Sequence, residues 1–332
     1  MNLGDISNSH VILILGAPRS GTSWIAKIFD SHPDVLYRHE PDTVLRAETF
    51  PWMCTEADVP SFKEEARAYL RKLMDVTTLK SAGSLPIFCK SYRGRRVEQL
   101  RSTLIYSLRA LDAIPRTRKF TRQIAIPDYF DRLDLSDLRV LIKSVSSRGR
   151  AGLFAEALPG AKVIFILRDP FGQVASMLRG VTLGKFEEEV PMGEVLQTPQ
   201  ATEYGLTFDR FKSLPIIERL TWNWAVLNEK AINDLAAVPT ARVLRYQDIT
   251  ADPIGTSQLL FEFVGLAWHP QAEAFIRRST TYNGRERYYN VLKNTTAAMN
   301  RWRSELTPDD QRRIRAIVQR TALKSFFPEV AD

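Results

Sequence analysis

Val11-Ile12-Leu13-Ile14-Leu15-Gly16-Ala17-Pro18-Arg19-Ser20-Gly21-Thr22-Ser23-Trp24 is the stretch of sequence from which the fold can be argued. Its run of aliphatic residues predicts a strand buried on both faces, which is typical of a parallel sheet. After a loop bounded by Gly16 and Gly21, the spacing of apolar residues predicts a helix that begins at Thr22. A strand, a glycine-bounded loop and a helix N-terminus together present backbone N–H groups and the positive end of a helix dipole to an anion. The stretch therefore predicts a phosphate-binding loop.

This loop differs from the commonest phosphate loop at one position. The common pattern is Gly, four residues, Gly, Lys and then Ser or Thr. Here Gly16 and Gly21 keep the frame, but Thr22 occupies the lysine position. A nucleotide triphosphatase would lack the cation that reaches the terminal phosphates. The cation of this loop is instead Arg19, so we expect a 5′-phosphate in the loop and the guanidinium on the next group along the ligand.

Size and composition limit the possible classes of protein. The chain has 332 residues and a formal net charge of +8, which suits one α/β domain with insertions and favours anionic ligands. Its basic residues are scattered, without a recognisable nucleic-acid module, so we expect no nucleic-acid partner. Cys54 and Cys89 are the only cysteines, which does not indicate a disulfide framework. No signal peptide or membrane-spanning run is visible, and we expect a cytoplasmic protein without a membrane span.

The second predicted strand, residues 35–37, leads to the candidate general base. Glu40 follows the carboxyl end of this strand, where doubly wound sheets bind their ligands. We therefore expect Glu40 to take the proton of an acceptor group. His39 is the rival base. Because neighbouring side chains of an extended segment point in opposite directions, we expect only one of the two to act.

Residues from about 44 to 138 do not follow the strand–helix–strand pattern. Apolar spacing predicts amphipathic helices over 61–74 and 97–111. Basic residues are frequent here, namely Lys90, Arg93, Arg95, Arg96, Arg101, Arg116, Arg118, Lys119 and Arg122. We interpret the segment as an inserted acceptor-binding or lid region. Its positive charge makes an anionic acceptor a working hypothesis.

Two later strands end in further candidate residues. Residues 139–144 predict a strand with Lys143 near its end, where a cation can stabilise charge that develops during group transfer. Residues 162–167 predict a buried strand that runs into Arg168-Asp169-Pro170, and Pro170 suits the first turn of the next helix. Ser176 lies two turns into that helix, so Arg168 and Ser176 are expected to meet one anion. Residues 182–213 predict a loop-rich lid or acceptor loop.

Several of these motifs resemble those of sulfotransferases that use 3′-phosphoadenosine-5′-phosphosulfate (PAPS). Gly-Ala-Pro-Arg-Ser-Gly-Thr-Ser-Trp looks like the 5′-phosphosulfate loop of that family, and it is more similar to the carbohydrate and protein-tyrosine branches than to the phenol branch, whose loop carries Lys. The resemblance implies that Arg19, Ser20, Gly21, Thr22 and Ser23 bind the 5′ group. It also implies that Arg168 and Ser176 clamp the 3′-phosphate, and that Glu40 and Lys143 are catalytic.

Two C-terminal stretches add to the resemblance. Tyr289-Asn290-Val291-Leu292-Lys293-Asn294 and Asn300-Arg301-Trp302 look like the loop that closes over the donor in related enzymes. By this resemblance, Lys293 and Arg301 are further candidates for the 3′-phosphate, and Trp302 packs the loop. Arg245-Tyr246-Gln247-Asp248 resembles a segment of the same family in which Glu occupies the position of Gln247. We expect this segment to have a mainly structural role.

The sequence thus predicts a single domain over residues 1–332, with a three-layer, doubly wound parallel sheet and a P-loop-like core carrying helical insertions. The predicted function is transfer of the sulfuryl group of PAPS to a hydroxyl or an amine, with Glu40 as base and with Arg19 and Lys143 stabilising charge. Carbohydrates and other anionic molecules, including lipids or small molecules, are the candidate acceptors. No metal is expected, because His10, His32, His39 and His269 lack ligand spacing.

Two other classes of function are open at this stage. A P-loop kinase or phosphotransferase would explain the loop and the charge, and tighter binding of ATP with magnesium than of adenosine 3′,5′-bisphosphate would favour it. A non-catalytic protein that binds adenosine phosphates would also keep the loop. In that class, Glu40→Ala would leave any transfer rate unchanged.

Overall fold

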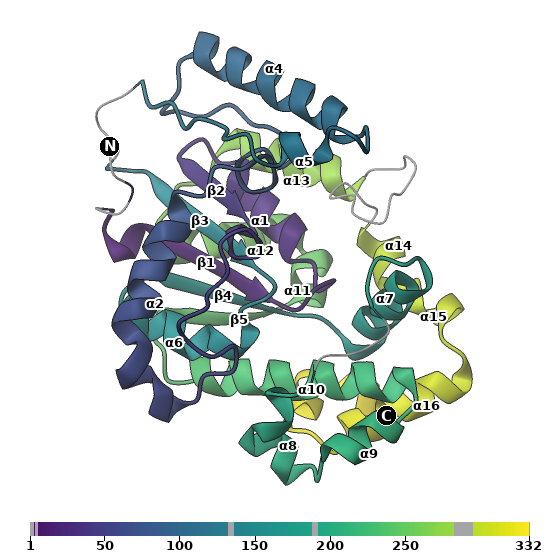
Figure 1. The fold of residues 1–332 in the computed structure, drawn as a ribbon. Coiled ribbons are helices and arrows are strands. Elements are labelled where there is room, and N and C mark those ends of the chain that lie inside the picture. The colour runs from purple at the N-terminus through teal and green to yellow at the C-terminus, as the bar shows by residue number, and fades with distance from the viewer. Residues whose placement is uncertain (1–2, 4–5, 132–135, 188–191, 282–294, 332) are drawn as a thin grey trace.

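The structure, a computed structural model, describes residues 3, 6–131, 136–187, 192–281 and 295–331. Its centre is a parallel sheet with the strand order β2-β3-β1-β4-β5 (Figure 1). The strands are β1 (Val11–Gly16), β2 (Val35–His39), β3 (Arg139–Ser144), β4 (Lys162–Leu167) and β5 (Ala241–Arg245). The predicted phosphate-loop strand, β1, lies in the middle, and its residues are all buried. The α/β class predicted from the sequence is confirmed.

Helices cover both faces of this sheet. Alternate residues of β1, Ile12 and Ile14, pack on one face with α1 (Thr22–Asp30), α12 (Pro253–Phe263) and α13 (Pro270–Thr280). Leu13 and Leu15 pack on the other face with α2 (Val59–Met74), α6 (Ala151–Ala157) and the end of α10 (Ile216–Leu235). Figure 1 shows the resulting layers. The three-layer arrangement follows from strands that are apolar on both sides.

A separate helical cluster adjoins the carboxyl ends of β4 and β5. It contains α7 (Pro170–Thr182), α8 (Pro199–Glu203), α9 (Phe208–Ser213), part of α10, and α16 (Pro308–Val318). Here the expectation of a lid or acceptor loop over 182–213 is wrong for residues 192–213, because Val195, Ala201 and Phe211 are buried in this cluster. Thr198 and Thr207 start the two short helices by accepting hydrogen bonds from the backbone N–H groups of Ala201 and Arg210.

The predicted insertion, residues 44–138, divides into two structurally different parts. Its first helix, α2, belongs to the core layer on the sheet. The remainder carries α3 (Leu79–Ala82), α4 (Arg95–Asp112) and α5 (Arg118–Thr121), and Figure 1 shows α4 along the outer edge of the molecule. Buried ion pairs attach this outer part to the core. The guanidinium of Arg38 on β2 binds Asp128, and Lys90 binds Asp30 at 3.0 Å.

The remaining α-helices of the described ranges are short: α11 (Tyr246–Ala251), α14 (Thr295–Asn300), α15 (Trp302–Glu305) and α17 (Pro328–Ala331). Trp302, expected to pack the C-terminal loop, stacks on Phe171 of α7 with 4.6 Å between ring centroids. Cys54 and Cys89 are both free thiols. Over the described ranges, no helix combines the length and the hydropathy needed to cross a bilayer.

Candidate active site

The loops at the carboxyl ends of β1 to β4 border a cleft, as expected for a parallel sheet. Its volume of about 740 Å³ is typical of sites that enclose ligands of nucleotide size. Phe186 and Ala298 of α14 complete its wall, together with residues of α3 and α4. The charged groups that line it in the described part of the chain are mostly cationic: Arg19, Lys80, Arg109, Lys143 and Arg168, with the carboxylate of Glu40 among them. This charge balance favours an anionic ligand.

The phosphate-binding loop has a tightly determined backbone. Arg19 and Gly21 both have left-handed φ values, of 70° and 95°. Ser20 is buried, and its hydroxyl donates to the carbonyl oxygen of Ala17 at 2.8 Å. A β-carbon at Gly21 would lie 2.3 Å from the ring of Tyr246, so no larger residue fits there without a shift. The loop therefore approaches its neighbours closely through its backbone, and α1 begins directly after it.

Arg19 connects this loop to the two residues predicted to bind the second phosphate. Its Nε donates to Ser176 Oγ of α7 at 3.1 Å. Its backbone carbonyl accepts from Nη1 of Arg168 at 2.9 Å. The loop after β1, the end of β4 and the face of α7 thus meet at one residue. The guanidinium of Arg19 lies on the Ser176 side of the loop, which sequence spacing alone did not indicate.

Arg168 is held between three elements. Its Nη2 donates to the carbonyl oxygen of Ala298 at 3.1 Å, and its guanidinium lies over the ring of Tyr246, 5.3 Å from the centroid. Within the described part of the chain its buried Nε has no hydrogen-bond partner, and a carboxylate oxygen of Asp169 lies 3.8 Å away. A buried guanidinium N–H without an acceptor, beside a cationic cleft, fits the binding of an anionic group such as the phosphate of a nucleotide donor.

Glu40 and Lys143 form the other half of the site. The backbone N–H of Glu40 donates to the Lys143 carbonyl at 2.8 Å, which extends the pairing of β2 with β3. Lys143 Nζ donates to Glu40 Oε1 at 2.5 Å, and Lys80 Nζ lies 3.0 Å from Glu40 Oε2. Burial alone would raise the pKa of Glu40, but the cations of Lys143 and Lys80 hold that pKa well below its usual range. Burial lowers the pKa of Lys143, while Glu40 opposes this shift.

His39 lies in the same cleft as Glu40. The expectation that the two side chains point apart is wrong, because Glu40 has a left-handed backbone with φ 46° and ends the strand alternation. Burial and the charge of Lys143 lower the pKa of His39 to about 3, so the ring is neutral near pH 7. Its Nδ1 is 2.7 Å from the hydroxyl of Tyr37.

The predicted site residues fall into three groups. Those that line the cleft are Arg19, Gly21, Thr22, Ser23, Glu40, Lys143 and Arg168. Ser20, Ser176 and Arg301 do not line it, although Ser176 contacts Arg19 directly. Lys293 lies outside the described residues. The roles assigned to these residues stay predictions, but most of the predicted residues from four separate segments share one cleft.

Among the cleft-lining residues that sequence reasoning missed are Lys80, Arg109, Phe186 and Tyr246. Tyr246 was available in the Arg245-Tyr246-Gln247-Asp248 segment, but that segment was expected to be mainly structural. Its ring packs against Gly21 and edge-on against Trp24, with 6.1 Å between centroids. Lys80 and Arg109 carried no local signal, because only the tertiary packing of α3 and α4 brings them to the cleft.

The basic residues of segment 44–138 have different environments. Lys90, Arg93 and Arg101 are buried: Lys90 pairs with Asp30, Arg93 with Glu98 at 3.1 Å, and Arg101 donates to backbone carbonyls. Those outside the interior are exposed, namely Arg95, Arg96, Arg116, Arg118, Lys119 and Arg122. None of these nine lines the cleft. In this segment the cations at the cleft are Lys80 and Arg109.

Among the described residues, no group of three or more His, Cys, Asp and Glu side chains is arranged to hold a metal ion. His32 and His269 lie close together, with 5.5 Å between ring centroids, in an edge-to-face contact.

Comparisons with known proteins agree on one family. The profile described as "Sulfotransferase family" matches residues 11–270. Zebrafish (Danio rerio) carbohydrate sulfotransferase 1 is 21% identical over 326 residues, which cover 90% of this chain and 73% of that protein. Mouse (Mus musculus) carbohydrate sulfotransferase 2 is 37% identical over 67 residues, 20% of this chain, and the match spans only 13% of the mouse protein.

A solved sulfotransferase from Alicyclobacillus acidocaldarius is 15% identical, with a TM-score of 0.41 and coverage of 97% of this chain and 95% of that chain. The family profile covers well over half of the chain and includes the phosphate-binding loop, Glu40, Lys143, Arg168 and Ser176. The chain therefore belongs to the sulfotransferase family.

Proposed function

We propose that this protein transfers a sulfuryl group from PAPS to a hydroxyl or an amine of an acceptor. The observation that carries the proposal is the junction at Arg19, where the phosphate-binding loop, Arg168 and Ser176 meet within hydrogen-bond distance. A donor with phosphates at both its 5′ and 3′ positions needs two anion sites close together. Membership of the sulfotransferase family supports the same reaction.

The donor would be held from two sides. Backbone N–H groups of the loop and the N-terminus of α1 face a 5′ phosphate group, while Arg168 and Ser176 bind the 3′-phosphate. The donor supplies the sulfuryl group, which passes to the acceptor atom as the bond to the 5′-phosphate oxygen breaks. Tyr246 keeps the loop and Arg168 in place through its contacts with both.

Lys143 and Glu40 would act on the reacting groups. Group transfer of this kind has a loose transition state, by analogy with phosphoryl transfer, so positioned cations give most of the stabilisation. The buried ammonium of Lys143 is such a cation. Glu40 accepts the acceptor proton once Lys143 turns from the carboxylate toward the anionic donor. That exchange raises the pKa of Glu40 from its depressed value and makes it a better base.

For the acceptor we propose a carbohydrate or another anionic molecule. Lys80 and Arg109 line the cleft on the α3–α4 side and would face such an acceptor. The zebrafish and mouse relatives are both named carbohydrate sulfotransferases, which supports a carbohydrate acceptor. We expect Lys80→Met or Arg109→Met to raise KM for an acidic glycan more than for its neutral counterpart. Equal effects on both acceptors would count against the anionic class. We also propose a cytoplasmic location, to be checked by cell fractionation.

The activity is tested with isotopically labelled PAPS and a panel of glycans, lipids and small alcohols. The wild-type chain should label at least one acceptor. Glu40→Gln should reduce kcat by about 10²- to 10⁴-fold, the usual loss for a general base, while the affinity for adenosine 3′,5′-bisphosphate stays near that of the wild type. An unchanged transfer rate in Glu40→Gln would show that Glu40 is not the general base, and only the binding of adenosine phosphates would then be supported. Thr182→Ala, an exposed change on α7, is the control.

A further inference from the structure

Helix α4 presents to the solvent an uncharged face that carries a stripe of exposed leucines. Its inward residues Ile105 and Leu108 pack with Leu79 and Ile126 in a small core. Leu100 (72% exposed), Leu104 (37%) and Leu111 (41%) form an outward stripe at helical spacing, and Ile114 (49%) follows the helix. Tyr106 (54%) lies apart from this stripe, with the exposed, uncharged Gln99, Thr103 and Ser107 between them. Between Gln99 and Leu111, the charged residues are Arg101 and Arg109. Both turn inward and donate to backbone carbonyls. Neighbouring exposed apolar side chains of this kind form a candidate binding surface.

Positive charge borders this face at both ends of the helix. Arg95 and Arg96 are exposed at its start, and Arg116, Arg118 and Lys119 are exposed just beyond its end. The nearby acids are already engaged. Glu98 is buried against Arg93, and Asp112 accepts a hydrogen bond from Thr121 and lies 3.8 Å from Arg122. The exposed face is therefore uncharged along its middle, where the leucine stripe lies, and basic at both margins.

We propose that this α4 face binds to the surface of an anionic lipid bilayer. An amphipathic helix with Leu, Ile and aromatic residues on one side and Lys or Arg around them lies in the headgroup region, where acidic lipids attract its basic margin. The helix stands along the outer edge of the molecule rather than inside a groove, so a flat surface can reach it (Figure 1). Phe120 of α5, the helix that follows α4, is a further exposed large apolar residue (64%).

The charge pattern argues against a second copy of the chain as the occupant. In a two-fold dimer the same patch meets itself. Antiparallel helices would then place Arg95 and Arg96 beside Arg116 and Lys119 of the other copy, and parallel helices would pair like ends. Both arrangements bring basic margins together. A negatively charged bilayer removes this repulsion. The inference does not depend on the proposed transfer reaction. Arg109 of α4 lines the cleft, so the cleft and the outer face of α4 are separated by about 10 Å, the diameter of one helix.

Vesicle sedimentation with the full chain tests the proposal. The vesicles are an equimolar mixture of phosphatidylcholine and phosphatidylglycerol, or phosphatidylcholine alone. The wild-type chain should sediment with the mixed vesicles and much less with the neutral ones. Leu100→Ser with Leu104→Ser, and separately Arg116→Glu with Lys119→Glu, should each weaken binding by about tenfold or more. All of these residues except Leu104 are well exposed, and circular dichroism checks that the variants fold.

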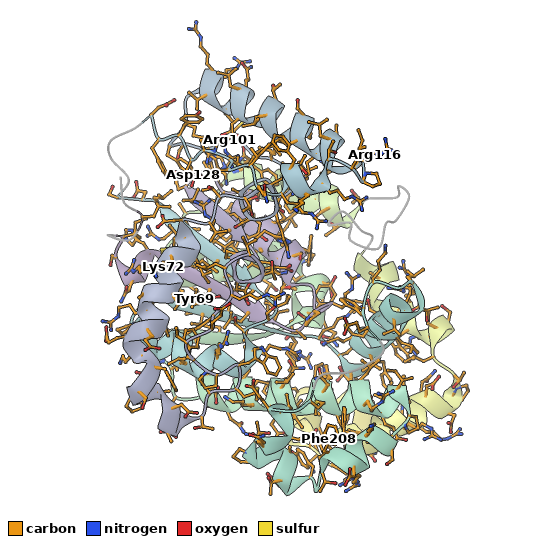
Figure 2. The ribbon with its side chains drawn as sticks, viewed as in Figure 1. Tyr69, Lys72, Arg101, Arg116, Asp128 and Phe208 are labelled. Carbon is orange, nitrogen blue, oxygen red and sulfur yellow. The ribbon has the colours of Figure 1, made fainter. Side chains whose placement is uncertain are left out.

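Phe208→Ser is the matched control, because Phe208 is 61% exposed on α9, at the opposite end of the molecule from Arg116 (Figure 2). This variant should bind mixed vesicles like the wild type. The proposal is overturned if the wild-type chain does not sediment with mixed vesicles, or if Phe208→Ser weakens binding as much as the α4 variants. It is also overturned if light scattering shows a dimer that the Leu100 and Leu104 changes dissociate while vesicle binding persists, since the face would then hold a second copy.

Discussion

At the scale of single residues, the phosphate-binding loop depends on conformations that most side chains avoid. Arg19, Gly21 and Glu40 all have left-handed backbones, and all three border the cleft. For Arg19 and Glu40 this conformation costs roughly 1–3 kcal/mol each. Their neighbours maintain it: Arg168 holds the carbonyl of Arg19, and Lys143 holds both the backbone and the carboxylate of Glu40. Strain at the ligand-facing residues is therefore coupled to the packing around them.

Gly21→Ala is predicted to damage this loop more than backbone strain alone would. The added carbon would lie 2.3 Å from the Tyr246 ring, so either the loop or the ring must move. We expect a loss of about 2–4 kcal/mol in the free energy of unfolding, from the φ penalty and the steric overlap together. Affinity for adenosine 3′,5′-bisphosphate, measured by calorimetry, should fall at least about tenfold.

Gly184→Ala is the control, because Gly184 also has a left-handed φ, of 62°, but no neighbouring atom of the described residues lies within 4 Å of the added carbon. It should lose only the backbone share of the stability, about 1 kcal/mol, and keep the ligand affinity. Similar losses of affinity in both variants would show that Tyr246 does not restrict the loop.

The ion pairs of Glu40 predict the shape of the pH profile. Because the pKa of Glu40 lies well below its usual range in the free protein, the carboxylate is ionised across the neutral region. The profile of kcat/KM, which reports the free enzyme, should therefore show no acid limb from Glu40 near neutrality. Lys80→Met removes one of the two cations, so the pKa of Glu40 moves upward and any acid limb shifts to higher pH. The account would be contradicted by an acid limb at about pH 6.5, the ordinary pKa of histidine, in the wild-type profile. The same limb would then persist in Lys80→Met.

At the scale of elements, the sequence predicted regular structure well where local pattern decides it. The strands at 139–144 and 162–167 have the predicted bounds, and Pro170 begins α7 as expected. β2 extends two residues beyond the prediction, to His39, because its pairing with β3 continues there. The error over residues 192–213 has a different origin. Short helices with few apolar residues are stabilised by packing against α10, which local patterning does not show.

Arg38 and Asp128 determine how the outer part of segment 44–138 is attached to the core. Arg38 is fully buried on β2, and Asp128 lies near Arg101 at the α4 end of the molecule in Figure 2. Asp128→Ala would leave the Arg38 guanidinium buried without its carboxylate, so we expect a loss of about 3 kcal/mol in the free energy of unfolding, measured with urea.

Glu64→Ala is the matched control for that measurement. Glu64 also pairs with an arginine, Arg67 at 2.8 Å, but its side chain is 74% exposed. Solvent screening makes such pairs weak, so this variant should be as stable as the wild type within error. A loss in Asp128→Ala no greater than in Glu64→Ala would mean that the buried pair does not stabilise the attachment. Whether the attached part acts as an acceptor-binding lid stays a prediction.

At the scale of the whole molecule, the cleft combines residues that are far apart in the chain. Arg19, Glu40, Lys143 and Arg168 could be predicted, because each lies at or just beyond the carboxyl end of a strand that the sequence marks clearly, and parallel strands end at one edge of a sheet. Lys80 and Arg109 could not, since only the attachment of α3 and α4 brings them there. Nor could the contact of Arg19 with Ser176 be read from spacing, because it depends on the side-chain direction within a strained loop.

The central claim is that the loop after β1 and the Arg168–Ser176 region bind two phosphates of one donor. Calorimetry with adenosine 3′,5′-bisphosphate and adenosine 5′-monophosphate, on the wild-type chain and Ser176→Ala, tests it most directly. Ser176 is preferable to Arg168 for this test, because Arg168 also holds the loop. Thr182→Ala on the same helix is the control.

The account predicts that the wild-type chain prefers the bisphosphate at least about tenfold, the equivalent of 1.4 kcal/mol. Ser176→Ala should reduce this preference severalfold with little change for the monophosphate, and Thr182→Ala should retain it. An equal preference in the wild-type chain and Ser176→Ala, or tighter binding of ATP with magnesium than of the bisphosphate, would contradict the claim.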